Sequence, residues 1–85
     1  MTVTKKQLDA ARKYRADHAY LLGLETADAL RLRGHGNPLL RHAGAMLADM
    51  DERHRRGDYN AQTDSQTANN ILQTVSADLI RQALA

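Results

Sequence analysis

The chain of 85 residues contains no cysteine, phenylalanine or tryptophan, and it has a single proline. Without cysteine it can form neither disulfides nor thiolate metal sites. With three tyrosines as its only aromatic residues, the core volume has to come from Leu, Ile, Val, Met and Ala. An alanine-rich core buries little area per residue, and a chain of this length has limited stability. A partner or self-association would supply the missing burial.

Long apolar runs are also absent. No stretch approaches the ~18 apolar residues of a membrane span. The first ten residues lack the apolar core of a signal peptide, so we expect a cytoplasmic protein that does not enter a membrane. The net charge of +2, from twelve Lys/Arg against ten Asp/Glu, is too small to indicate nucleic-acid binding by itself.

The clearest helical signal runs from Asn37 to Gly57. Asn37 is a good N-cap, and Pro38 falls at the first helical position, where its missing N–H costs nothing. Gly57 suits the left-handed conformation that ends a helix. Apolar side chains recur at helical spacing and form one stripe: Leu39, Leu40, Ala43, Met46, Leu47 and Met50.

The preceding segment, residues 4–33, predicts a longer helix. Thr4 and Gln7 form a capping-box pattern at its start. Its apolar residues lie on more than one side, which is typical of a helix with more than one neighbour. Because this helix exceeds the others in length, we expect it either to kink near Gly23 or to overhang at one end. The short connection at 34–37 predicts an antiparallel hairpin with the next helix.

A third helix is predicted after the break at 57–60. It begins between Asn60 and Ser65, with Thr63 and Gln66 as a second possible capping box, and continues to residue 84. The sequence therefore predicts one all-α domain over residues 1–85. Its architecture is a three-helix bundle on an antiparallel hairpin, with helices at about 4–33, 38–56 and 63–84.

The third helix carries few charges. From residue 61 to 85 only Asp64, Asp78 and Arg81 are charged. Uncharged amides and hydroxyls are less costly to desolvate than ions, so this face is a candidate partner-binding surface. The sequence supports equally well the alternative that these side chains form an ordinary exposed polar face. The candidate residues are Asn69, Asn70, Gln73, Thr74 and Arg81.

Two basic clusters form the second candidate surface. In a bundle of alternating helices, the start of the first helix and the end of the second lie at the same end of the molecule. The clusters would then make one basic patch for a phosphate backbone or an acidic protein surface. Interleaved carboxylates, and the preference of cations for helix C-termini, offer a simpler explanation. The patch residues are Lys5, Lys6, Arg12, Arg53, Arg55 and Arg56.

No pattern indicates catalysis, and we expect no enzyme, cofactor, metal site or catalytic residue. The four histidines show no metal-binding spacing. His18 falls near the apolar line of its helix, and we expect it to be half-buried. His54 lies three residues after Asp51, so a carboxylate–imidazole pair is possible.

Two similarities bear on function. The segments 36–40 and 78–82 resemble the plan of type III secretion needle subunits, which are helical hairpins with an assembling C-terminal helix. The distance from Pro38 to the tail and the break at Gly57 depart from that plan, so the chain is not assigned to the family. In size and mixed charge it is similar to phage or plasmid accessory proteins that dock on host machines, including inhibitors of CRISPR complexes.

The favoured hypothesis is a small non-enzymatic helical protein-interaction module. It would dock on, and in some settings inhibit, a larger protein or nucleoprotein complex. The alternatives are a nucleic-acid-binding regulator that uses the basic patch, and a self-assembling structural subunit.

Overall fold

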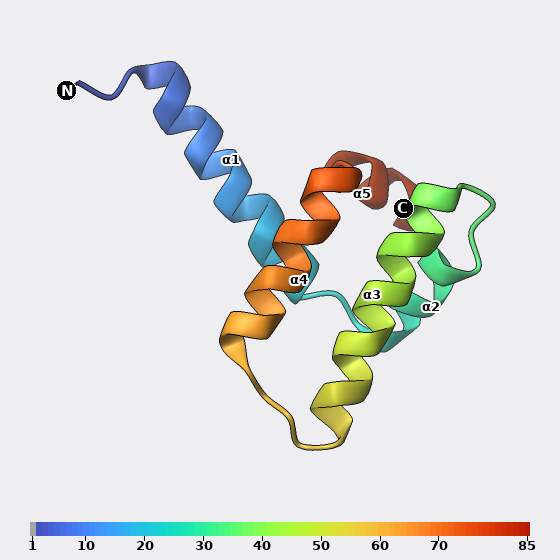
Figure 1. Ribbon diagram of the computed structural model, residues 1–85. Coiled ribbons are helices and arrows are strands. Elements are labelled where there is room, and N and C mark those ends of the chain that lie inside the picture. The colour runs from blue at the N-terminus through green and yellow to red at the C-terminus, as the bar shows by residue number, and fades with distance from the viewer. Residues whose placement is uncertain (1) are drawn as a thin grey trace.

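The computed structural model describes residues 2–85, and this part of the chain is all-helical, as predicted (Figure 1). It contains five helices where the sequence analysis expected three, because both outer segments are divided by a break. The helices are α1 (Lys5–Leu22), α2 (Thr26–Arg33), α3 (Pro38–Arg55), α4 (Ala61–Thr74) and α5 (Ala77–Leu84).

The first predicted helix is divided between α1 and α2. The capping box at its start is formed: the Gln7 backbone N–H donates to Thr4 Oγ1 at 3.1 Å, and the Thr4 N–H donates to Gln7 Oε1 at 3.0 Å. The helix ends at Leu22, and Gly23 caps it. A new helix starts after Glu25, whose N–H donates to Asp28 Oδ2 at 3.2 Å. The expected kink is therefore a complete break, and the N-terminal end overhangs as well.

The central helix α3 has the predicted caps. Asn37 Oδ1 accepts the Leu39 N–H at 2.9 Å, and Pro38 occupies the first helical position. The helix ends at Arg55, one residue before the predicted boundary, and Gly57 has the expected positive φ of 84°.

The last predicted helix is divided between α4 and α5. Asn60 caps α4 by accepting the Thr63 N–H at 3.0 Å, so the helix starts before the possible capping box at Thr63. Val75 is extended, with φ −146° and ψ 142°, and it is buried. Ser76 then caps α5 by accepting the Leu79 N–H at 3.1 Å.

The break after α4 changes how the chain packs. α4 lies against α1 and α3, whereas α5 turns to contact α2 and α1 (Figure 1). All five helices contribute to one core of small and medium apolar side chains. Its buried members are Leu21, Ala29, Leu32, Leu40, Ala43, Leu47, Met50, Ala68, Ile71, Val75 and Ile80. None of the helices in residues 2–85 combines the length and the apolar character that crossing a membrane requires.

The backbones of α2 and α3 come into close contact at Gly44. A Cβ atom at this position would lie 2.7 Å from the carbonyl carbon of Leu32 and 2.8 Å from the carbonyl oxygen of Ala29, and closer still to the Arg33 nitrogen. These are backbone atoms, which cannot move aside as the end of a side chain can. The glycine therefore sets how near α2 lies to α3.

We expect Gly44→Ala to destabilise the protein by about 3 kcal/mol, because the added methyl group forces α2 away from α3. Chemical denaturation followed by circular dichroism measures this change. Gly36→Ala is the matched control, since a Cβ there meets nothing within 4 Å, and we expect it to change the free energy of unfolding by less than about 0.5 kcal/mol. Equal stability of the two variants would contradict the close contact.

Candidate protein-interaction site

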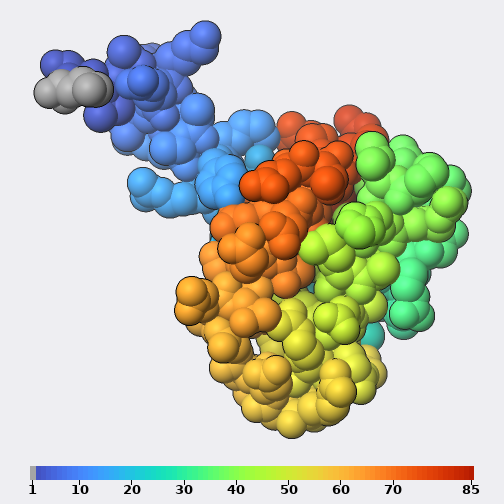
Figure 2. Space-filling model, viewed as in Figure 1, coloured from blue at the N-terminus to red at the C-terminus, as the bar shows by residue number. Residues whose placement is uncertain are grey.

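The first half of α1 stands clear of the rest of the molecule (Figure 1, Figure 2). We call residues 2–16 the arm. Every residue of the arm is exposed, including the apolar side chains of Val3, Leu8 and Tyr14. A helical segment of this length has marginal stability in water when nothing packs against it. The arm is therefore the part of the protein with most to gain from a partner.

Helix α1 has two distinct faces. Tyr14, Asp17 and Leu21 follow one another at spacings of three and four, and they lie on the side of α1 that meets the body. On another face, three cations and one leucine follow one another at spacings of three, four and three residues. We call these residues the cationic stripe: Lys5, Leu8, Arg12 and Arg15.

An ionic network joins the base of the arm to α5. Lys13 Nζ lies 3.2 Å from both Asp17 Oδ2 and Asp78 Oδ2. Arg81 donates to Asp78 Oδ1 at 2.8 Å, reaches Asp17 Oδ1 at 3.0 Å, and lies over the ring of Tyr20. The Lys13 hydrogen bond and charge lower the pKa of Asp78. Hydrogen bonds to Asp17 and then Asp78 raise the pKa of Lys13, and the hydrogen bond to Asp17 chiefly raises that of Arg81.

A second set of contacts joins α1 to α4. The Tyr14 hydroxyl hydrogen-bonds to Asn69 Oδ1. Half-buried His18 lies with Nε2 3.2 Å from Ser65 Oγ and 3.3 Å from the Ser65 carbonyl oxygen. The expectation of a half-buried histidine at this position is confirmed. These contacts, together with the ionic network, fix the direction in which the arm leaves the body.

The predicted partner-binding face is divided by these contacts. Asn69 and Arg81 face α1 and are used within the chain. Asn70, Gln73 and Thr74 remain exposed, although Asn70 accepts a hydrogen bond from Gln66 at 3.0 Å. Arg81 belongs to α5 rather than to the helix that carries the other four. Two of the five residues are therefore engaged within the chain, and the other three remain exposed on α4.

The single basic patch predicted from the sequence is not formed. Lys5, Lys6 and Arg12 lie on the arm, while the arginines 53, 55 and 56 lie at the end of α3 on the opposite side of the molecule (Figure 1). The expectation assumed that residues 4–33 form one helix antiparallel to the next. The break after Gly23 turns the chain, so the arm leaves in another direction.

The arginines at the end of α3 are also balanced by carboxylates. Arg55 pairs with Asp51 at 2.9 Å, and Arg56 lies 4.0 Å from Glu52. Arg53 lies 3.7 Å from the nearest oxygen of Asp49 and 3.9 Å from that of Asp64. This end of the molecule therefore has no excess of positive charge to offer a phosphate backbone.

The carboxylate partner of His54 is Asp64, at 2.7 Å, and not Asp51 as the spacing had suggested. Asp64 belongs to the next helix, so this pair joins α3 to α4. Tyr59 stacks on the His54 ring with 5.2 Å between centroids. Within residues 2–85 no three side chains of the metal-binding types His, Asp and Glu come together.

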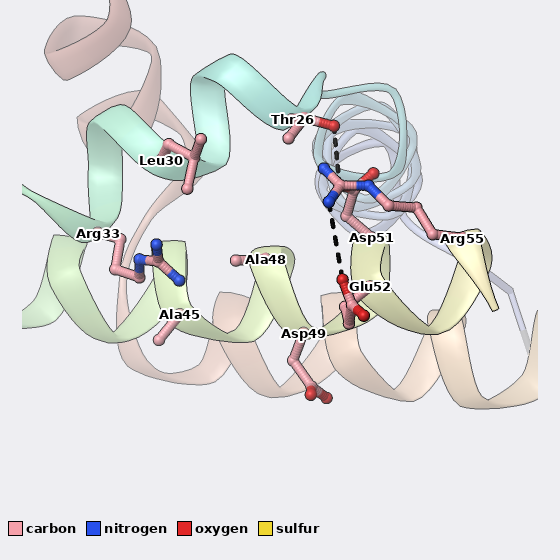
Figure 3. A pocket seen from close by; sticks show the side chains of 9 residues that line it. All are labelled: Thr26, Leu30, Arg33, Ala45, Ala48, Asp49, Asp51, Glu52 and Arg55. Atoms are coloured by element: carbon pink, nitrogen blue, oxygen red, sulfur yellow. Dashed lines mark hydrogen bonds and ion pairs between the residues drawn. The ribbon is translucent and has the colours of Figure 1, made fainter.

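Sequence reasoning missed a groove between α2 and α3, with a volume of about 440 Å³ (Figure 3). Its apolar lining is Leu30, Ala45 and Ala48. The charged side chains around it are Asp49, Asp51, Glu52, Arg33 and Arg55. The small residues at 44, 45 and 48 were the available signal, but their meaning depends on knowing that α2 lies over them.

Comparison with known proteins gives no match to a family model, a curated protein or a solved structure. The surfaces of the molecule are therefore the guide to its function. Of these, the arm is the most distinctive, because it is a regular helix held only at its base.

We expect Asp78→Asn to lower the thermal unfolding midpoint near neutral pH and to have little effect in acid. The reason is the lowered pKa of Asp78: its stabilising contribution is present above the ordinary carboxyl pKa of 3.8 and is lost as the pH falls below it. Scanning calorimetry of both proteins across this range tests the expectation. Asp58→Asn, in the exposed loop before α4, is the control and should leave the difference near zero. A constant difference at all pH values would contradict the ionic network.

Proposed function

We propose that this protein is a non-enzymatic helical protein-interaction module, and that the arm is the element that docks on its partner. The observation that supports this most is the exposure of every residue from 2 to 16, although residues 5–16 are helical. The body supplies a rigid base through the contacts of α1 with α4 and α5. The arm is thereby presented in a defined direction rather than as a free tail.

The charge distribution indicates the chemistry of the partner. The arm carries five cations and only one carboxylate, Asp9, so its net charge is +4. Because the whole chain has a net charge of +2, residues 17–85 together have a net charge of −2. A surface that receives the arm is therefore acidic, and charge attraction would speed the encounter.

Leu8 gives the arm an apolar anchor. Its side chain is exposed and lies within the cationic stripe. Helix-in-groove recognition commonly depends on one or more such apolar residues at helical spacing, with charges around them for orientation. Binding would bury Leu8 and stabilise the arm helix at the same time, which favours an interaction that depends on folded geometry.

We expect Leu8→Asp to abolish capture of the partner protein from a lysate of the source cells, because it places a charge where the apolar anchor binds. Leu39→Asp is the matched control: Leu39 is 48% exposed and Leu8 is 41% exposed, but Leu39 lies on α3. Quantitative mass spectrometry of the captured proteins gives the measurement. If both variants capture the same proteins as the natural chain, docking through the arm is wrong.

A second candidate function is nucleic-acid binding through the arm, and the observation that favours it is the concentration of positive charge on this one helix. The arm lies apart from the acidic body, so its cations other than Lys13, which pairs with Asp17 and Asp78, are accessible to a phosphate backbone. The cluster at the end of α3 does not contribute, because its arginines are paired with carboxylates.

If the arm binds nucleic acid, an electrophoretic shift appears at low salt and is lost steeply as salt rises, because binding releases counterions from the phosphates. Arg12→Glu should weaken this binding at every sequence tested. If the natural chain gives no electrophoretic shift at low salt with any duplex or single strand, this second function is excluded.

A further inference from the structure

We propose that the arm of one copy of this chain docks in the α2–α3 groove of a second copy. This inference rests on the proposed function, in which the arm is the docking element, and it names the partner as another molecule of the same chain. The groove is the one lined by Leu30, Ala45 and Ala48, with carboxylates along its α3 side (Figure 3).

The two surfaces have complementary chemistry. The cationic stripe presents one leucine among three cations. The groove presents one half-exposed leucine, Leu30, beside three carboxylates: Asp49, Asp51 and Glu52. Leu8 can then contact Leu30 and the two alanines, while the cations of the stripe lie beside the carboxylates. Such charge pairs fix the orientation of a helix in a groove and exclude partners of the wrong sign.

The dimensions also agree. The helical part of the arm, residues 5–16, is about 18 Å long, and the α3 side of the groove, residues 45–55, is about 16 Å long, at 1.5 Å per residue. Ala45 and Ala48 are small, so a second helix can approach α3 closely over them. α2 forms the other wall, held in place by its contact with Gly44.

The groove also contains two cations, Arg33 and Arg55. Arg55 is engaged by Asp51 at 2.9 Å and lies 3.7 Å from Glu52. The side chains of Asp49 and Glu52 remain 72% and 54% exposed. Arg33 lies at the other end of the groove from Asp51 and Glu52 (Figure 3). Asp49 and Glu52 also lie 3.7 Å from Arg53 and 4.0 Å from Arg56. Because these contacts are long and both side chains are exposed, the two carboxylates remain accessible to the cationic stripe.

The arm that docks in the groove comes from another copy, because each arm leaves its own molecule in a direction away from its own groove. In Figure 1 the arm leaves the molecule on the side away from α2 and α3, so it does not reach the groove of its own chain. Arm-to-arm contact would bring together two segments of charge +4, which repel. The oppositely charged body of a second copy is the better match, and mutual exchange of arms closes into a two-fold dimer.

Analytical ultracentrifugation of the full chain over a wide concentration range tests this proposal. We expect self-association at low salt that weakens as salt rises, since the contact is largely electrostatic. Arg12→Glu should weaken it about tenfold. Lys6→Glu is the matched control: it makes the same charge change on the same helix but lies off the cationic stripe, and it should have a much smaller effect.

A charge exchange gives the stricter test. Glu52→Lys, or Asp49→Lys if the first variant does not fold, should weaken self-association as Arg12→Glu does. The combination of Arg12→Glu with the groove variant should restore it, because the pair is re-formed with reversed signs. Far-UV circular dichroism checks that each variant keeps its helical content.

Three outcomes would overturn the proposal: a monomer at all concentrations in low salt, equal effects of Arg12→Glu and Lys6→Glu, or no recovery in the combined variant. None of these would remove the proposed function itself. That function is tested separately by comparing Leu8→Asp with Leu39→Asp in partner capture, so the failure of one is distinguishable from the failure of the other.

Discussion

The contact of the α2 backbone with Gly44 is the constraint on which the rest of this structure depends. Because no side chain lies between them at this point, α2 and α3 behave as one unit. The two helices contribute Ala29, Leu32 and Leu40, among others, to a core whose buried members include no large aromatic side chain. Close backbone approach compensates for small residues, since it brings many atoms into van der Waals contact. Beside this close contact between the two helices, an open groove lies over Ala45 and Ala48.

The direction in which α1 leaves the body is set by its contacts with α4 and α5. The chain breaks at Gly23, and only the second half of α1 finds neighbours. Those neighbours are polar as well as apolar: Asp78 and Arg81 on α5, and Ser65 on α4. Some of the polar side chains that the sequence analysis assigned to a partner-binding face are therefore engaged in contacts within the chain. The arm, which is held to the body through Lys13 and Tyr14, remains exposed along its length, so it is the element best placed to meet a partner.

Charge is divided unevenly between these two parts. The arm is basic and the body is slightly acidic, although the net charge of the whole chain is close to zero. Within the body most arginines have carboxylate partners, as at Arg53, Arg55 and Arg81. Exposed pairs of this kind add little to stability. Their larger effect is to cancel local charge, so the field of the molecule is dominated by the arm.

What the sequence determined by itself is local: the all-helical class, the capping box at Thr4, the N-cap at Asn37 with Pro38 after it, and the left-handed turn at Gly57. These features depend on a few neighbouring residues, so their pattern can be read without knowing the fold. The break after Thr74, the pairing of His54 with Asp64 and the groove over Ala45 were decided by tertiary structure. Each depends on which distant segments come within a few ångströms, and packing and charge interactions at such distances leave no fixed spacing in the sequence.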